Sequence, residues 1–223
     1  MAISDVAYKI LWGRAAGRCS NPGCREDLTV ILDRPGAYHI GEMAHIIAKS
    51  PSGPRGQDAG GPDAYENLIL LCPTCHKRID KAPPGEFTEG RLRGWKKGHE
   101  DGVRNQGKNE RFDSLAQLKA AVSRLLIENR TIWLTLGPKS EVATSDPGSN
   151  LYVIWNLRVG DTIVPNNQRI INLIEANVEL LPLQEFEVFL AFKNHATAFE
   201  EHWADRLDAY PTFPRVFEEV FRP

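Results

Sequence analysis

Four cysteines stand in two close pairs, and paired cysteines are typical ligands of a structural zinc ion. Cys19 and Cys24 are separated by four residues, and Cys72 and Cys75 by two. Zinc prefers four tetrahedral ligands, which two tight turns supply without distorting the chain. In a reducing compartment such cysteines bind metal more often than they form disulfides. We therefore expect one structural Zn2+ with no open coordination position, the alternative being four unrelated buried thiols.

A second set of polar residues lies between and after the cysteine pairs. His45 has an alanine before it and two isoleucines after it, and Asn67 stands between glutamate and leucine. His76 directly follows the second cysteine pair, and Asp80 comes four residues later. Over about residues 10–99 this combination resembles the HNH endonuclease family, whose core is a ββα-metal finger. The C-terminal half carries no such resemblance.

The resemblance implies a role for each of these residues in phosphodiester hydrolysis. His45 would be the general base that takes a proton from the attacking water, a task that suits an imidazole. Asn67 would orient either the other ring nitrogen of that histidine or the loop that carries it. His76 would bind a divalent cation, and Asp80, one helical turn later on the same face, would supply a second ligand. The cation would stabilise the charge that grows on the phosphate and on the leaving oxygen.

One position departs from the family pattern. Many members carry aspartate or histidine, as a metal ligand, immediately before the base, whereas this chain has Ala44. Side chains of a strand alternate between its faces, so Glu42 lies on the same side as residue 44 and is the expected replacement ligand. A site of two protein ligands with water, or a backbone carbonyl, are the alternatives. A set of histidine and carboxylate ligands favours Mg2+ or Mn2+ over tightly bound zinc.

Basic residues follow the expected metal ligands. The window 77–97 contains seven Lys and Arg against three acidic residues, a balance of +4. Because each neutralised phosphate releases counterions, such a stripe favours binding to DNA, although a solvated charged surface is the alternative. Trp95 is the expected hydrophobic anchor of this segment, and His99 at its end is expected to be solvated. The expected DNA-binding residues are Lys77, Arg78, Lys81, Arg91, Arg93, Lys96 and Lys97.

A small α+β domain is needed to position these residues. A Gly/Pro-rich loop covers 50–62, and an apolar run at 68–71 leads into the second cysteine pair. His39 is expected to be structural or to contact phosphate. The predicted order is strand, strand, helix: helix 6–14, strands 28–32 and 39–47 with a turn at 33–36, and a helix from 72 through 80.

The second half has apolar residues at helical spacing, which predicts a mainly α-helical C-terminal domain. His195 and His202 share a helix face without an acidic residue that would complete a familiar metal motif, and are expected to be structural. The first expected helix begins after a cap at Asp113 or Ser114 and buries Leu115, Leu118, Val122, Leu125 and Leu126. The second follows Pro165 and buries Ile170, Ile171, Ile174, Val178 and Leu181. The third covers about 184–207, precedes a short last segment at 215–221, and buries Phe186, Phe189, Phe199 and Trp203.

The charge of the chain is distributed unevenly. Its 223 residues include 27 Lys and Arg and 29 Asp and Glu, a formal charge of −2 that taken alone argues against a nucleic-acid-binding protein. Residues 1–109 carry a balance of +3, and the remainder carries −5. The polar, glycine-containing segment 100–111 is interpreted as a linker between a nuclease domain at 1–105 and a regulatory or oligomerisation domain at 106–223.

The leading hypothesis is a metal-dependent DNA endonuclease that the C-terminal domain controls or targets. By analogy of architecture, we expect an effector nuclease of bacterial anti-phage defence acting on double-stranded DNA. A zinc-stabilised DNA-binding module without catalytic activity, and a sequence-specific restriction or homing nuclease, are the alternatives. A homodimer, a protein partner and an activating ligand remain open. The absence of a signal-like N-terminus and of a long apolar run predicts a soluble, cytoplasmic protein.

Overall fold

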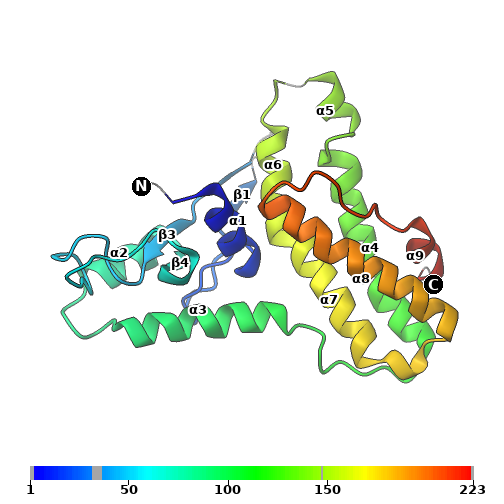
Figure 1. The fold of residues 1–223 in the computed structure, drawn as a ribbon, viewed down its shortest axis with the longest axis horizontal. Coiled ribbons are helices and arrows are strands. Elements are labelled where there is room, and N and C mark those ends of the chain that lie inside the picture. Colours follow the sequence, from blue (N-terminus) through cyan, green and yellow to red (C-terminus); the bar gives the residue numbers. More distant parts are fainter. Residues whose placement is uncertain (1–2, 32–36, 147, 222–223) are drawn as a thin grey trace. The chain divides into compact units, whose positions relative to one another are not determined.

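The computed structural model describes residues 3–31, 37–146 and 148–221. The chain divides into two compact units, Met1–Val103 and Arg104–Pro223 (Figure 1). The first unit combines helices with short strands, and the second is built from helices. The expected α+β class, with a mainly helical C-terminal part, is therefore confirmed. None of the described helices is long and apolar enough to cross a membrane.

Helix α1 (Asp5–Arg14) supplies the largest aromatic side chain in the core of the first unit. The Ser4 hydroxyl caps the helix by accepting a hydrogen bond from the Ala7 amide at 3.1 Å. Trp12 is 1% exposed, and the His39 ring packs edge-on against it with the ring centroids 5.2 Å apart. Of the two expectations for His39, a structural contact is therefore the one observed.

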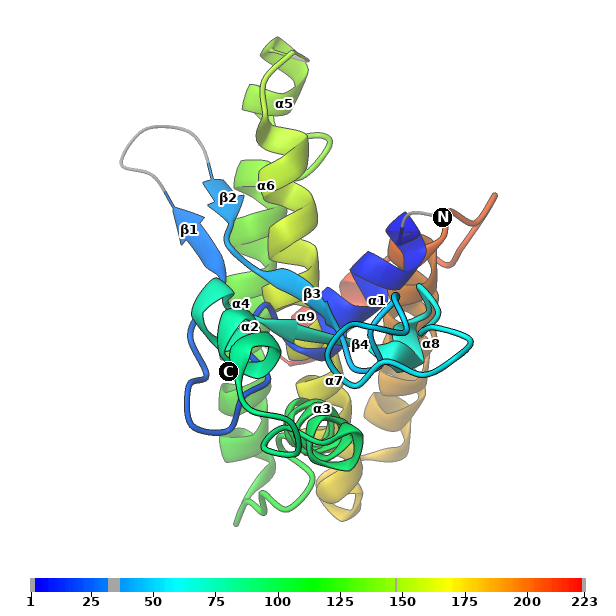
Figure 2. The same cartoon turned by 90° about the vertical axis from the view of Figure 1, so that its left-hand side faces the viewer.

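Four short strands follow as two antiparallel pairs. Strand β1 (Thr29–Ile31) pairs with β2 (Ala37–His39), and β3 (Glu42–His45) pairs with β4 (Leu68–Leu71) (Figure 2). The expectation of a single strand over 39–47 is wrong, because the chain leaves one sheet for the other around Gly41. A Cβ atom at Gly41 would lie 2.8 Å from the Trp12 ring, so the core admits only a glycine at this crossing. The predicted turn at 33–36 lies outside the described residues.

Strand β4 leads directly into the helix that completes the ββα unit. All four residues of β4 are buried, as the apolar run predicts. A short 3-10 turn (η1, Tyr65–Asn67) precedes the strand, and α2 (Pro73–Lys81) follows it with Cys72 as the N-cap. Proline suits the first helical position because the missing N–H has no partner there. Helix α2 packs against both β3 and β4.

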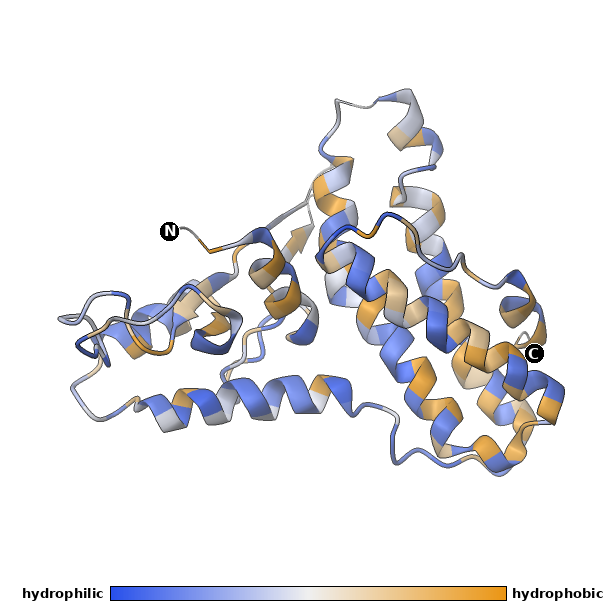
Figure 3. Cartoon of the chain, in the orientation of Figure 1, coloured by the Kyte–Doolittle hydropathy of each residue, from blue (hydrophilic) through white to orange (hydrophobic). Residues whose placement is uncertain are grey.

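Helix α3 (Glu89–Arg104) extends into the segment expected to be a linker, so that expectation is wrong for residues 100–104. The solvated position expected for His99 is also wrong. The His99 side chain is 5% exposed, and its Nε2 donates to the carbonyl of Ala15 at 2.9 Å. This buried contact holds the last turns of α3 on the core, although Figure 3 shows the helix to be mainly hydrophilic. Trp95 packs edge-on against Phe87, with ring centroids 5.5 Å apart.

Every regular element in the described part of the second unit is helical. Ser114 caps the first helix by accepting a hydrogen bond from the Gln117 amide, and of the two predicted caps it is the one observed. The elements are α4 (Leu115–Leu136), α5 (Glu141–Ser145), α6 (Leu151–Arg158), a π-helical turn η2 (Val159–Ile163), α7 (Val164–Ala176), a 3-10 turn η3 (Val178–Leu180), α8 (Leu183–Ala204) and α9 (Arg215–Val220).

Helix α7 differs from the expectation at both ends. It does not start after Pro165, because α6 continues through the π-helical turn and Pro165 lies in the first turn of α7. The predicted burial of Val178 is wrong: the side chain is 43% exposed. Helix α7 ends at Ala176, so the 3-10 turn that follows breaks the periodicity that placed Val178 on the buried face.

Two apolar clusters form the interior of the second unit. The larger one joins α4, α7, α8 and α9, and the Phe192 and Phe217 rings stack in it with centroids 4.1 Å apart and planes 7° apart. The smaller one centres on Trp155, Phe199 and Trp203. Figure 3 shows hydrophobic residues along α7 and α8, where these clusters form.

Candidate functional site

The four cysteines converge on one point of the first unit. Their Sγ atoms all lie within 4.8 Å of one another, and none of the four forms a disulfide. The Sγ atoms of Cys24 and Cys72 are 3.9 Å apart. Four thiolates around a tetrahedral zinc ion at about 2.3 Å are separated by about 3.8 Å, so the spacing fits a shared ion.

Local hydrogen bonds prepare this cluster for a cation. The Cys75 amide donates to Cys72 Sγ at 3.4 Å, and the buried Asn21 donates through Nδ2 to Cys75 Sγ at 3.1 Å. Burial raises the pKa of the Cys19 thiol to about 11 and also raises that of Cys72. A bound divalent cation would offset the cost of buried thiolate charge. The donor set therefore fits Zn2+, and Asn21 is a supporting residue that no sequence pattern predicts.

His45 is the last residue of β3 and faces an acidic partner. Its Nε2 lies 2.8 Å from Asp63 Oδ1, and Lys49 Nζ lies 2.6 Å from Asp63 Oδ2. The hydrogen bonds from Lys49 and His45 lower the pKa of the Asp63 carboxyl. His45 Nδ1 has no hydrogen-bond partner among the described residues. Asp63 is not predicted from the sequence, because it lies in an irregular loop and belongs to no periodic pattern.

Asn67 ties together the two ends of the loop that follows His45. Its Oδ1 accepts from the Ile47 amide at 2.9 Å, and its Nδ2 donates to the carbonyls of Ile47 and Pro62, both at 3.0 Å. A Cβ atom at Gly61 would lie 2.0 Å from the Ile47 carbonyl oxygen, so glycine is needed for this close approach. Of the two roles expected for Asn67, the observed contacts are those that hold the loop.

His76 is flanked by two carboxylates, one at each ring nitrogen. Nδ1 lies 2.7 Å from Glu42 Oε2, and Nε2 lies 3.2 Å from Asp80 Oδ2. All three side chains are partly open to solvent. An imidazole and oxygen ligands are a donor set that suits a divalent cation. A ring whose Nδ1 donates to Glu42 has Nε2 left for a cation on the side of Asp80.

Arg55 links two histidine clusters, one formed by His45 with Asp63 and the other by His76 with Glu42 and Asp80. Its guanidinium donates to the carbonyl of His45 at 3.3 Å and to Asp80 Oδ1 at 3.2 Å. It also donates to the carbonyls of Ile46 at 2.7 Å and Ile79 at 2.9 Å. One side chain from the loop therefore connects the end of β3 with the end of α2, a role that no sequence pattern predicts.

The expected basic stripe is present only in part. The expectation for Lys96 is wrong: it is 8% exposed, forms an ion pair with Glu100 at 2.8 Å and lies 3.6 Å from the centroid of the Tyr65 ring. Burial lowers the pKa of its ammonium group. Lys96 is therefore not accessible to a phosphate. The other expected DNA-binding residues are exposed: Lys77, Arg78, Lys81, Arg91, Arg93 and Lys97.

Comparison with known proteins identifies the segment that carries these clusters. Residues 34–81 match the model of the HNH endonuclease family, which confirms the resemblance for this part of the chain. The match contains His45, Asp63, Asn67, His76 and Asp80. The first cysteine pair and the entire second unit lie outside it. A comparison with curated proteins finds no match.

Proposed function

We propose that the chain is a metal-dependent DNA endonuclease whose active site lies at the end of β3 and on α2. The observation that carries the proposal is the joining of the two histidine clusters by Arg55. This side chain binds the backbone of His45, the candidate base, and the carboxylate of Asp80, the candidate metal ligand. The match of residues 34–81 to the HNH endonuclease family supports the same assignment.

In this proposal His45 acts as the general base. With the proton of the neutral ring on Nε2 and donated to Asp63, Nδ1 is the atom that accepts a proton from water. The water oxygen attacks phosphorus, the bond from phosphorus to the leaving oxygen breaks, and the water proton passes to Nδ1. Asp63 stabilises the imidazolium that forms, and a proton from solvent neutralises the leaving oxygen.

His76 and Asp80 are the proposed ligands of a catalytic Mg2+ or Mn2+. When bound, the cation supplies electrostatic stabilisation of the charge that develops on the phosphate and the leaving oxygen. Glu42, expected as a replacement ligand for Ala44, is better placed to orient His76 through its hydrogen bond to Nδ1. The four cysteines hold a separate structural Zn2+ at the start of α2, the helix that carries both ligands.

The exposed basic residues near the site are the proposed contacts for the DNA backbone. Lys77, Arg78 and Lys81 lie on α2 itself, whereas Arg91, Arg93 and Lys97 lie on α3. Arg93 and Lys97 already form ion pairs with acidic side chains of α3, so the α2 residues are the stronger candidates. Contacts of this kind bind DNA without reading its sequence.

The second unit is proposed to control or target the nuclease, as in effector nucleases of anti-phage defence. The support is an analogy of architecture: an HNH segment is joined to a helical unit outside the family match. A silencing role predicts that a chain ending at residue 105 cleaves DNA faster than the full chain. Unchanged cleavage together with an unchanged oligomeric state would contradict the control role.

A plasmid assay tests the proposed activity. The purified chain is incubated with supercoiled plasmid and Mg2+ or Mn2+, with and without a chelator, beside His45→Ala and the matched control His202→Ala. Cleavage that requires the cation and is lost only in His45→Ala is the expected result. DNA binding without cleavage by the unaltered chain would favour the zinc-stabilised binding module. Discrete fragments instead of general degradation would favour a restriction or homing nuclease.

A further inference from the structure

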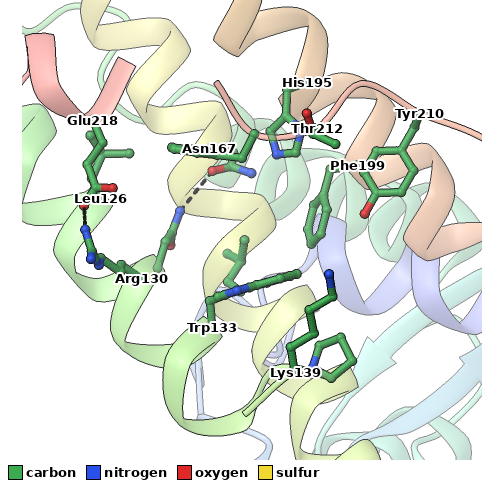
Figure 4. Close-up of a pocket in the computed structure, with 14 residues that line it drawn as sticks. Leu126, Arg130, Trp133, Lys139, Asn167, His195, Phe199, Tyr210, Thr212 and Glu218 are labelled. Atoms are coloured by element: carbon green, nitrogen blue, oxygen red, sulfur yellow. Dashed lines mark hydrogen bonds and ion pairs between the residues drawn. The ribbon is translucent and has the colours of Figure 1, made fainter. Parts of the chain in front are cut away.

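A cavity of about 490 Å3 opens within the second unit (Figure 4). Its volume lies in the range of roughly 300–1,000 Å3 that is typical of small-molecule sites. Four aromatic side chains line it: Trp133 from α4, Phe199 from α8, and Tyr210 and Phe213 from the segment between α8 and α9. Walls of this kind favour a ligand with a flat π-system.

Asn167 presents a hydrogen-bond donor without a protein partner to this cavity. The residue is 7% exposed, and its Oδ1 accepts a hydrogen bond from Asn129 Nδ2 at 2.9 Å. The amide nitrogen has no hydrogen-bond partner among the described residues, and Figure 4 shows that the dashed hydrogen bond goes to the oxygen of the amide group. The residue as a whole is largely buried, and a donor that faces the cavity gains a partner there only from a ligand or from water.

His195 presents an acceptor in the same cavity. Its Nδ1 lies 2.7 Å from the Pro211 carbonyl, which can only accept, so Nδ1 carries a proton. The side chain is largely buried, and burial lowers the pKa of the ring, which favours the neutral form. Nε2 is then an acceptor, and it has no partner within the described part of the chain. The cavity therefore offers one donor and one acceptor among aromatic walls.

The charged residues of the cavity leave one positive charge without a counter-ion. Arg130 forms an ion pair with Glu218. Lys139 forms no ion pair with any described residue, and Figure 4 shows its side chain extended towards Phe199. A cationic ligand would be repelled at this position. A purely apolar ligand would leave Asn167 and His195 without partners, which lowers affinity.

We propose that this cavity binds one nucleotide. The base stacks against the aromatic walls and places its edge on Asn167 Nδ2 and His195 Nε2, and the phosphate binds Lys139. Nucleobases combine a π-face with donors and acceptors on their edges, which is the combination that this lining complements. A free mononucleotide and the end of a nucleic-acid strand share this chemistry. The site lies entirely in the second unit, so the inference does not depend on the proposed nuclease activity.

Binding to the full chain tests the inference. The probes are the ribonucleoside and deoxyribonucleoside 5′-monophosphates, the corresponding nucleosides, and a 5′-phosphorylated trinucleotide, measured by calorimetry and thermal unfolding with the His45→Ala chain. We expect at least one monophosphate to bind with a stoichiometry of one and to raise the unfolding temperature. The corresponding nucleoside should bind about tenfold more weakly or worse, because it lacks the charge-assisted contact. Tighter binding of the trinucleotide would identify a strand end as the source.

Two variants assign the binding to this cavity. Lys139→Gln should lower the affinity for the nucleotide about tenfold and leave that for the nucleoside unchanged. Asn167→Asp keeps the oxygen that accepts from Asn129 but removes the donor, so it should abolish binding. Lys193→Gln, which alters a lysine outside the lining, is the matched control. The inference is overturned if no probe binds at millimolar concentration, or if binding survives both cavity variants unchanged.

Discussion

His45 Nε2 lies 2.8 Å from Asp63 Oδ1, although the two residues are 18 positions apart. The other oxygen of the same carboxylate binds Lys49. The Asp63 carboxylate therefore lies between the candidate base and the ammonium group of Lys49. Asn67 holds the loop that makes this contact, because it bonds to Ile47 near one end and to Pro62 near the other.

Asp63→Asn should lower the rate of DNA cleavage by about 10- to 100-fold, since a neutral amide stabilises the imidazolium less well than a carboxylate. The rate is measured on plasmid under saturating Mg2+. Asp58→Asn, which alters an exposed aspartate of the same loop, is the control and should cleave normally. Equal rates for the two variants would show that Asp63 has no part in the reaction.

The same pair predicts how stability depends on pH. The pKa of the Asp63 carboxyl lies below its ordinary value of 3.8, first because of the hydrogen bond from Lys49 and then that from His45. A carboxyl whose pKa falls on folding stabilises the fold above its unfolded-state pKa, and this contribution disappears as the pH falls through the folded-state pKa. Asp63→Asn should therefore unfold at a lower temperature than the unaltered chain at pH 7. The difference should shrink below about pH 3.8. A difference that stays constant down to pH 3 would contradict this account.

The two carboxylates beside His76 should respond differently to amide substitution. Glu42→Gln keeps an oxygen that can accept from Nδ1, so cleavage should fall less than about threefold, whereas Glu42→Ala should cost about tenfold or more. Asp80→Asn weakens a proposed ligand and should raise the Mg2+ concentration required for half-maximal cleavage by about 10- to 100-fold. Titration of cleavage with Mg2+ measures all three variants. A similar Mg2+ requirement in Glu42→Gln and Asp80→Asn would make Glu42 a ligand as well.

The cysteine cluster predicts one zinc ion per chain. Removal of the ion with a chelator should unfold the first unit, because four thiols, three of them buried, do not hold the start of α2 without a cation. Metal analysis and circular dichroism measure the two effects. Cys72→Ser should lose the ion, whereas Asn21→Ala, which removes a hydrogen bond to Cys75, should weaken its affinity about 10- to 100-fold. A folded, zinc-free chain with unchanged stability would refute the structural role.

The stacked rings of Phe192 and Phe217 predict the stability of the second unit. Phe217 is fully buried, and Phe217→Ala should lower the free energy of unfolding by about 3–5 kcal/mol. Val216 precedes it on α9 but is 53% exposed, so Val216→Ala should change stability by less than about 0.5 kcal/mol. Denaturant unfolding of both variants provides the comparison. Similar losses would show that α9 does not pack through Phe217.

Much of the fold could be predicted because it depends on local spacing. The cysteine pairs, the apolar run of β4 and the helical periodicity around Leu118 and Ile170 each span only a few turns or residues. Such patterns persist in the structure because burial of the apolar face directly stabilises the helix or strand that carries it. Predictions failed where tertiary contacts override the local pattern, as at Gly41, where the chain passes against Trp12.

Burial of charged and polar side chains could not be derived from composition. Lys96 and His99 lie in a hydrophilic helix, and spacing alone gives no sign that their partners are Glu100 with the Tyr65 ring, and the Ala15 carbonyl. A polar side chain can be buried only where a partner compensates its lost hydration. That partner can come from a distant part of the chain.

The sequence by itself determined which residue types are available for the proposed chemistry: the four thiols, His45, Asn67, His76 and Asp80. Only the tertiary structure decided which side chains these residues contact. Asp63 and Arg55 come from the irregular loop that connects β3 to β4 along the chain. Their contacts with His45 and Asp80 exist because that loop folds back onto the end of β3 and onto α2. Hydrogen bonds require specific distances and angles between atoms, and for groups far apart along the chain these are set by folding, not by spacing.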